Sequence, residues 1–228
     1  MEFLSGLLAD AVRELFGFGA ELRRILFLTL AVAGIATAIG VLVGVPLGTW
    51  LALTRHRLRR TIDVLINAGM GIPPVLAGLL ILILLWNDGP LGALDLIFTP
   101  VAMVGAQALL AIPIAAGVTA GAIRGLGPAA NEQLVALRLT SSRRGFVAAR
   151  EALPGVIAAV AAAFGRVVSE VGAVLIVGGN IEGETQVLTT AIVQQARQAR
   201  FDSALALGFV LLIIVALVNV ALGRLRSV

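Results

Sequence analysis

Long apolar segments constrain this chain more than any other feature of its sequence. Each has about 20 or more predominantly apolar residues, which is the length of a transmembrane helix. Charged residues make up only 13% of the 228 residues, against about a quarter in an average soluble domain. The sequence therefore predicts an all-α, polytopic membrane protein with about five transmembrane helices. We expect one transmembrane domain over residues 25–226, with spans at residues 25–53, 62–86, 99–123, 154–179 and 204–222.

Residues 1–24 precede the first span and do not resemble it. Their apolar side chains recur at helical spacing, but charged residues interrupt them too often for a span. We expect a helix lying at the membrane interface. A terminal helix packed on the bundle stays open as the alternative.

The distribution of arginine predicts the topology. All 17 basic residues are arginine, and a five-span arrangement with the C-terminus inside and the N-terminus outside puts eleven of them in the cytoplasm. Cytoplasmic loops of membrane proteins carry such an excess. Arg23 and Arg24, beside the first span, favour the opposite orientation on their own. We expect a multi-pass membrane protein in this orientation. Arginines near spans are a topology signal, so the basic balance does not indicate nucleic-acid binding.

The second predicted span is interrupted in its middle third by Gly69, Gly71, Pro73 and Pro74. Adjacent prolines remove backbone donors and break the helical hydrogen-bond ladder. Irregular backbone at membrane depth occurs where it is buried in protein or lines a cavity. The interruption therefore predicts either a kinked pore-lining helix or a buried packing kink. Asn67, on the cytoplasmic side of the break, becomes a pathway candidate.

Small residues recur in the first span. Gly40, Gly44 and Gly48 stand four residues apart, a spacing that lets another helix backbone approach closely. That helix could belong to the same protomer or to a second subunit.

Arg166 and Glu170 are the ionised pair deep in the fourth predicted span. Four residues apart on a continuous helix, they should share a face and neutralise each other. Charges inside a bilayer mark either a transport path or a paired internal contact. Both roles stay open for this pair.

The polar segment at residues 136–154 separates the third and fourth spans. It carries Arg138, Arg143, Arg144 and Arg150 and ends on proline where an apolar helix begins. A loop between two rigid spans can transmit a rigid-body shift to them. The alternative is a basic loop that only sets the topology.

The sequence lacks residues that several kinds of active site require. Without lysine the chain cannot form the G-x-x-x-x-G-K-[ST] phosphate loop, so it should not hydrolyse ATP by itself. It has no cysteine, and His56 is its single histidine, so we expect no metal site. These absences favour a transport subunit over an enzyme.

Two segments resemble a known family. ALRLTSSR at residues 136–143 is similar to the A-x-x-L-G-A-S-R pattern in the cytoplasmic loop of membrane subunits of ABC importers with the type I fold. Thr140 stands where that pattern has glycine. FGRVVSEVGA at 164–173, GNIEG at 179–183 and LTTAI at 188–192 resemble the molybdate/tungstate/sulfate branch, and the tungstate subgroup most. IPPVLAG at 72–78 fits the same branch.

The resemblance implies a translocation subunit that moves tungstate or a similar oxyanion by alternating access. It implies a homodimer, cytoplasmic ATPase subunits that bind ATP and Mg²⁺, and an extracytoplasmic anion-binding protein. No cofactor would bind this chain itself. The loop at residues 128–154 would form a short helix that docks on the ATPase. An ion-coupled anion carrier or channel that acts without an ATPase remains the alternative.

These expectations name two sets of candidate residues. The ATPase-coupling loop comprises Ala136, Leu137, Arg138, Leu139, Thr140, Ser141, Ser142, Arg143 and Pro154. The candidates for the pathway or its gate are Asn67, Pro73, Pro74, Arg166, Ser169, Glu170, Asn180 and Thr185.

Overall fold

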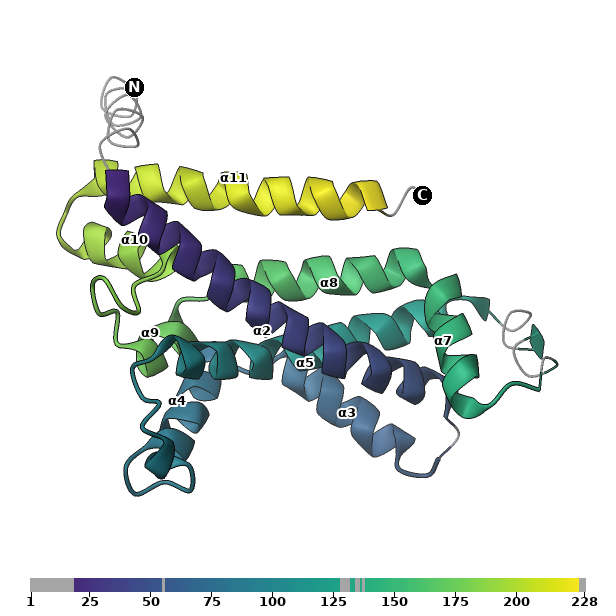
Figure 1. The fold of residues 1–228 in the computed structure, drawn as a ribbon. Helices are drawn as coiled ribbons and strands as arrows, with labels where there is room; N and C mark the ends of the chain where they lie inside the picture. Colours follow the sequence, from purple (N-terminus) through teal and green to yellow (C-terminus); the bar gives the residue numbers. More distant parts are fainter. Residues whose placement is uncertain (1–18, 55, 128–131, 134–135, 137, 226–228) are drawn as a thin grey trace. The chain divides into compact units, whose positions relative to one another are not determined.

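The computed structural model describes residues 19–54, 56–127, 132–133, 136 and 138–225. This part of the chain is helical and contains no strand (Figure 1), which confirms the predicted all-α class. The elements are α2 (Gly19–Leu53), α3 (Arg59–Met70), α4 (Pro74–Leu85), the 3₁₀ turn η1 (Gly92–Leu94), α5 (Pro100–Arg124), α7 (Ser141–Glu151), α8 (Leu153–Val168), α9 (Gly172–Gly178), α10 (Leu188–Arg197) and α11 (Phe201–Leu225).

Three of these helices, α2, α5 and α11, are individually long and apolar enough to cross a membrane. Among the described residues the number rises to five if α3 with α4, and α7 with α8, each count as one broken span. The helix predicted for residues 1–24 falls mostly outside the described residues. Residues 19–24 already belong to α2, so the predicted boundary at residue 24 is wrong.

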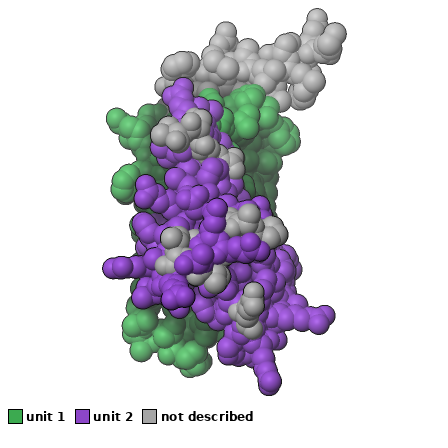
Figure 2. Space-filling view, turned by 90° about the vertical axis from the view of Figure 1, so that its right-hand side faces the viewer, with its two compact units in different colours: residues 1–35, 74–107, 168–218 green, residues 36–73, 108–167, 219–228 purple. Residues whose placement is uncertain are grey.

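The chain divides into two compact units (Figure 2). Unit 1 comprises residues 1–35, 74–107 and 168–218, and unit 2 comprises residues 36–73, 108–167 and 219–228. Each unit is therefore assembled from segments that are far apart in the sequence.

The second predicted span is broken where the sequence indicates. α3 ends at Met70 and α4 begins at Pro74. Pro74 is the first residue of its helix, where the missing N–H costs no hydrogen bond. The amide of Gly71 donates to the carbonyl of Ala68 at 3.0 Å and closes the last turn of α3.

The fourth predicted span is not one helix, and this corrects the sequence-based interpretation. α8 ends at Val168, residues 169–171 are not helical, and α9 begins at Gly172. Arg166 lies in α8, whereas Glu170 lies between the two helices. The argument that they share a helix face is therefore wrong, because the helix stops before it reaches Glu170.

Within unit 2, α2 and α5 pack through very small side chains. A Cβ atom added to Gly44 would lie 2.7 Å from the carbonyl oxygen of Ile112 and 2.7 Å from Cβ of Ala115. Gly40 faces Ala111 and Gly48 faces Ala116 in the same way. The glycine spacing thus serves packing within one protomer. The contacts advance along both helices together, so α2 and α5 run in the same direction.

We predict that Gly44→Ala destabilises the protein. The added methyl group meets backbone atoms that cannot move aside, and overpacking of this kind costs about 1–3 kcal/mol. A thermal-unfolding measurement on the purified protein should show a clear drop in Tm. The matched control is Gly34→Ala in the same helix, where an added Cβ meets nothing within 4 Å. Because alanine is the better helix former, the control should keep or raise the Tm. Equal Tm values for the two variants would contradict the close packing.

Candidate functional site

Helix α7 forms within the predicted coupling loop. Thr140 is extended, with φ −59° and ψ 154°, and the helix begins at the next residue. Ser141, Ser142 and Arg143 make its first turn. The chain bends by 80° between α7 and α8. Pro154 is the second residue of α8, so the predicted start of an apolar helix at this proline is present.

The remaining loop candidates precede α7. Ala136 is exposed, and Leu139 is half-buried. Arg138 has a positive φ of 48°, which is uncommon for residues other than glycine. Leu137 lies outside the described residues.

One face of α7 packs on the ends of α2 and α5 in unit 2. Ala148 and Ala152 form a buried cluster with Ile123 near the end of α5, and Leu53 at the end of α2 packs against that cluster. The guanidinium of Arg144 donates to the carbonyl oxygen of Leu53 at 3.2 Å. A displacement of α7 would therefore act directly on both long helices.

The other face of α7 is exposed. Ser142, Arg143, Phe146 and Arg150 are three or four residues apart and thus neighbours on one side of the helix. Phe146 is 71% exposed. An exposed aromatic side chain beside arginines has the composition of a protein-binding surface. We call these four residues the outer face of α7.

Sequence reasoning missed Phe146. The available signal was the amphipathic pattern of residues 141–151. Ala148 and Ala152 mark the packed side of α7, and Phe146 falls on the opposite side.

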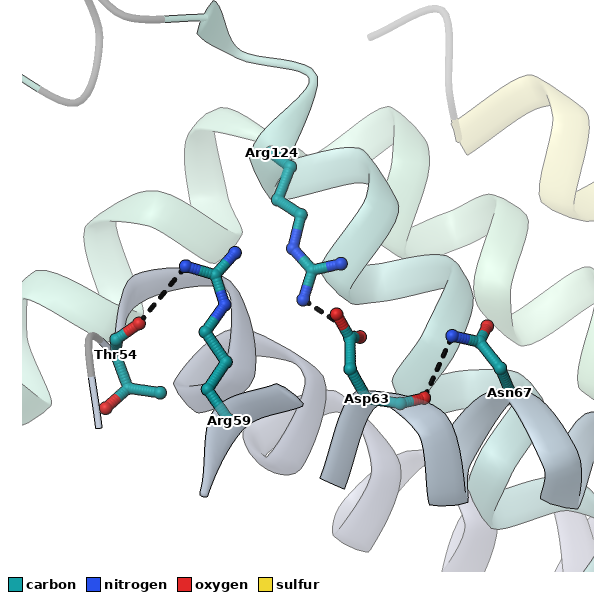
Figure 3. A network of polar contacts seen from close by, with 5 residues as sticks. All are labelled: Thr54, Arg59, Asp63, Asn67 and Arg124. Atoms are coloured by element: carbon teal, nitrogen blue, oxygen red, sulfur yellow. Dashed lines mark hydrogen bonds and ion pairs between the residues drawn. The ribbon is translucent and has the colours of Figure 1, made fainter. Parts of the chain in front are cut away.

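A polar network ties α3 to the end of α5 (Figure 3). The guanidinium of Arg124 donates to a carboxylate oxygen of Asp63 at 3.0 Å. The side-chain amide of Asn67 donates to the backbone carbonyl of Asp63 at 2.9 Å. Arg59 donates to the carbonyl of Thr54 at 3.4 Å. Both members of the ion pair are about one-third exposed, so the pair fixes geometry more than it adds stability.

In unit 1, Glu170 organises the start of α9. One of its carboxylate oxygens accepts hydrogen bonds from the backbone amides of Val171, Gly172 and Ala173, at 3.0, 2.7 and 3.4 Å. Its backbone carbonyl accepts from the hydroxyl of Thr189 in α10 at 2.9 Å. Glu170 is 6% exposed. The carboxylate therefore satisfies backbone donors that the break between α8 and α9 leaves open.

Helices α4 and α9 pack so closely that no side chain separates their backbones at Gly78. A Cβ atom added to Gly78 would lie 2.8 Å from Cα of Ala173, and one added to Gly172 would lie 2.8 Å from Cγ2 of Val75. The helix that begins with Pro74 thus lies against the helix that begins beside Glu170.

Asn180 and Thr185 shape the segment between α9 and α10. Thr185 is fully buried, and its hydroxyl accepts from the amide of Ile181 and donates to the carbonyl of Gly178. The amide of Asn180 donates to Oε1 of Gln194 at 2.6 Å. Gln186 donates to the same oxygen at 2.7 Å. These side chains close a loop onto α10.

The pathway candidates divide between the two units. Unit 1 holds Pro74, Ser169, Glu170, Asn180 and Thr185, and unit 2 holds Asn67, Pro73 and Arg166. Ser169 is exposed directly beside the buried Glu170. Sequence reasoning missed the polar partners Gln186, Thr189 and Gln194. Among the described residues, no group of histidine, aspartate and glutamate side chains is placed to hold a metal ion.

Comparisons with known proteins give a consistent result. The family model described as "Binding-protein-dependent transport system inner membrane component" matches residues 44–227. The tungstate uptake system permease protein TupB of Peptoclostridium acidaminophilum is 35% identical over 227 residues, and the match covers 100% of both chains. A probable anion ABC transporter permease protein of Haloferax volcanii is 36% identical over 204 residues, covering 87% of this chain and 88% of its own.

A solved structure shares the fold. The MetNI methionine ABC transporter, in an inward-facing conformation, has a chain that matches with a TM-score of 0.73 and 22% identity. The match covers 92% of this chain and 97% of that one.

We predict that Glu170→Ala destabilises the protein more than Glu170→Gln. Alanine leaves the amides at the start of α9 without their acceptor, and an unsatisfied buried donor costs about 1–3 kcal/mol. Glutamine has a side chain of the same length and keeps one acceptor oxygen. Thermal unfolding of the two purified variants should rank wild type above Gln and Gln above Ala. A Tm for Glu170→Ala equal to that of wild type would remove this role from the carboxylate.

Proposed function

The chain belongs to the family of binding-protein-dependent transport system inner membrane components, and on this premise we propose that it is the translocation subunit of an ATP-driven importer of tungstate or a similar oxyanion. The main support is the 35% identity to a permease named for tungstate uptake, over the full length of both chains. A relative named for molybdenum transport, ModB of Azotobacter vinelandii, is 31% identical over 194 residues, covering 81% of this chain and 86% of its own.

The partners follow from the same premise. The family is that of inner-membrane proteins whose transport depends on a binding protein. We infer that an extracytoplasmic protein delivers the anion and that cytoplasmic ATPase subunits bind ATP and Mg²⁺. The absence of lysine from the sequence supports a separate ATPase, because a phosphate loop needs that residue. The translocation unit would be a homodimer.

The outer face of α7 is the proposed contact with the ATPase. Its opposite face is fixed to α2 and α5 by Arg144, Ala148 and Ala152. When the ATPase subunits close on ATP, a shift of α7 would pass to both helices as a rigid-body movement. Alternating access would follow from that movement.

The proposed topology places the C-terminus and α7 inside and the N-terminus outside. The parallel course of α2 and α5 supports this, because their final residues, Leu53 and Arg124, then lie on the same side of the membrane. The arginine-rich segment at residues 55–60 and Arg124 would both be cytoplasmic, in agreement with the positive-inside rule.

The anion path would run along the broken helices. Irregular backbone at membrane depth is tolerated where it lines a cavity or is buried in protein. Ser169 of unit 1 is an exposed residue at the second break and is our first candidate to line the path. Glu170 and Thr185 are buried, and their side-chain oxygens accept hydrogen bonds from backbone amides. We therefore assign them the role of positioning the backbone around the path.

Reconstitution tests this function. Proteoliposomes that contain the chain, its ATPase and its binding protein should take up tungstate only when ATP is supplied. Uptake should stop when the ATPase is omitted. Uptake by the purified chain alone, driven by an ion gradient, would overturn the proposal and support an ion-coupled carrier. Calorimetric titration of the binding protein with tungstate and with molybdate would identify the preferred anion.

We predict that Phe146→Asp uncouples ATP hydrolysis from uptake. Loss of a central aromatic contact at an interface typically costs about 2 kcal/mol or more, so tungstate uptake should fall by at least about tenfold. The variant should keep its Tm, because this side chain is exposed. The control is Glu151→Ala, an exposed residue of α7 that is not part of the outer face. Normal uptake by Phe146→Asp would remove the outer face from the coupling contact.

A further inference from the structure

An apolar groove lies on α10 and α11 in unit 1. It is lined by Ile192 of α10 and by Phe201, Leu205, Gly208, Phe209 and Leu212 of α11. Its volume of about 710 Å³ falls within the roughly 300–1,000 Å³ of common ligand pockets. Its wall is almost entirely apolar, so a polar occupant would lose hydrogen bonds to water without replacement.

The groove is held open by the packing beneath it. Leu188 and Ala191 of α10 form a buried cluster with Ile25 of α2 and Leu207 of α11. Figure 1 shows α10 beside the beginnings of α2 and α11. Since these contacts fix α10 against α11, the two walls of the groove keep their separation.

Gly208 leaves part of the groove empty. A Cβ atom added there meets nothing within 4 Å. Leu212, one turn further along α11, is 64% exposed. The groove is therefore open on the surface of the protomer, where an apolar transmembrane helix meets either lipid acyl chains or a second protomer.

Two arginines are close in sequence to Phe201, the first residue of α11 that lines this groove. Arg197 lies in the last turn of α10, and Arg200 directly precedes Phe201, which lines the groove. Both residues are exposed. Asp202 follows in the first turn of α11, so the three charges together are net positive. Phe201 begins the apolar helix α11, which puts these charges at the level of the lipid headgroups.

We propose that the groove holds an acyl chain of an anionic phospholipid, with its phosphate bound by Arg197 and Arg200. The apolar wall matches the acyl chain, and arginine binds phosphate through two parallel hydrogen bonds. An anionic headgroup adds attraction to both arginines. A second copy of this chain would need neither the empty space at Gly208 nor the charges beside Phe201.

Native mass spectrometry of the purified full-length protein tests the proposal. Phosphatidylglycerol and phosphatidylcholine with identical acyl chains are added separately, and bound lipid is counted. Wild type should retain phosphatidylglycerol at least about tenfold more strongly, because the positive choline group of phosphatidylcholine repels the two arginines. The double variant Arg197→Gln/Arg200→Gln should lose this preference and keep its weak binding of phosphatidylcholine.

Two further variants test the acyl-chain site. Gly208→Leu should fill the groove and reduce the retention of both lipids. Its matched control is Gly223→Leu in the same helix, where an added Cβ also meets nothing within 4 Å and which does not line the groove. Arg60→Gln, an exposed arginine of α3, controls for loss of positive charge. Both controls should bind lipid as wild type does.

Two outcomes would overturn the proposal. One is equal retention of the two lipids by wild type and by the double arginine variant. The other is a change in oligomeric mass for Gly208→Leu without a change in lipid retention, which would identify the groove as an interface between copies of the chain. If Gly208→Leu fails to fold, the double arginine variant decides alone, because its side chains are exposed and outside the core.

Discussion

The close contact between α2 and α5 fixes the part of unit 2 on which α7 packs. Glycine on α2 faces alanine on α5 at three successive turns, so the two backbones lie side by side. Because the helices run in the same direction, Leu53 and Ile123 come together at their ends. Helix α7 packs on that pair, and Arg124 reaches Asp63 from the same end. Larger side chains at the three glycines would separate the helix ends and remove the platform on which α7 rests.

The two helix breaks differ in how they deal with backbone N–H groups that lack a helical acceptor. In a membrane, backbone donors need partners inside the protein. At the first break the prolines simply lack the donors. At the second break Glu170 supplies a carboxylate that accepts from three consecutive amides. The first break ends where the chain passes from unit 2 to unit 1, between Pro73 and Pro74. The second break follows the next such crossing, which lies between Val167 and Val168 at the end of α8.

The sequence predicts features that depend on local composition and misses those that depend on distant contacts. Length and apolarity indicate the long helices, and Pro73 and Pro74 indicate the first break. The second break has no proline, and Glu170 looks like the partner of Arg166 on a continuous helix. The hydrogen bonds that its carboxylate accepts from the amides at the start of α9 become visible only in three dimensions. The ion pair of Asp63 and Arg124 joins residues 61 positions apart, which no local pattern indicates.

The composition of α7 suits the two tasks proposed for it. Its packed side carries Gly145, Ala148 and Ala152, which have no flexible side chains. Contacts between small groups and backbone are stiff, since protein interiors are close-packed, so little movement would be lost between α7 and the long helices. Its outer face carries Phe146 and arginines, which have large contact areas and reach. A partner can therefore bind one side firmly while the other side transmits displacement.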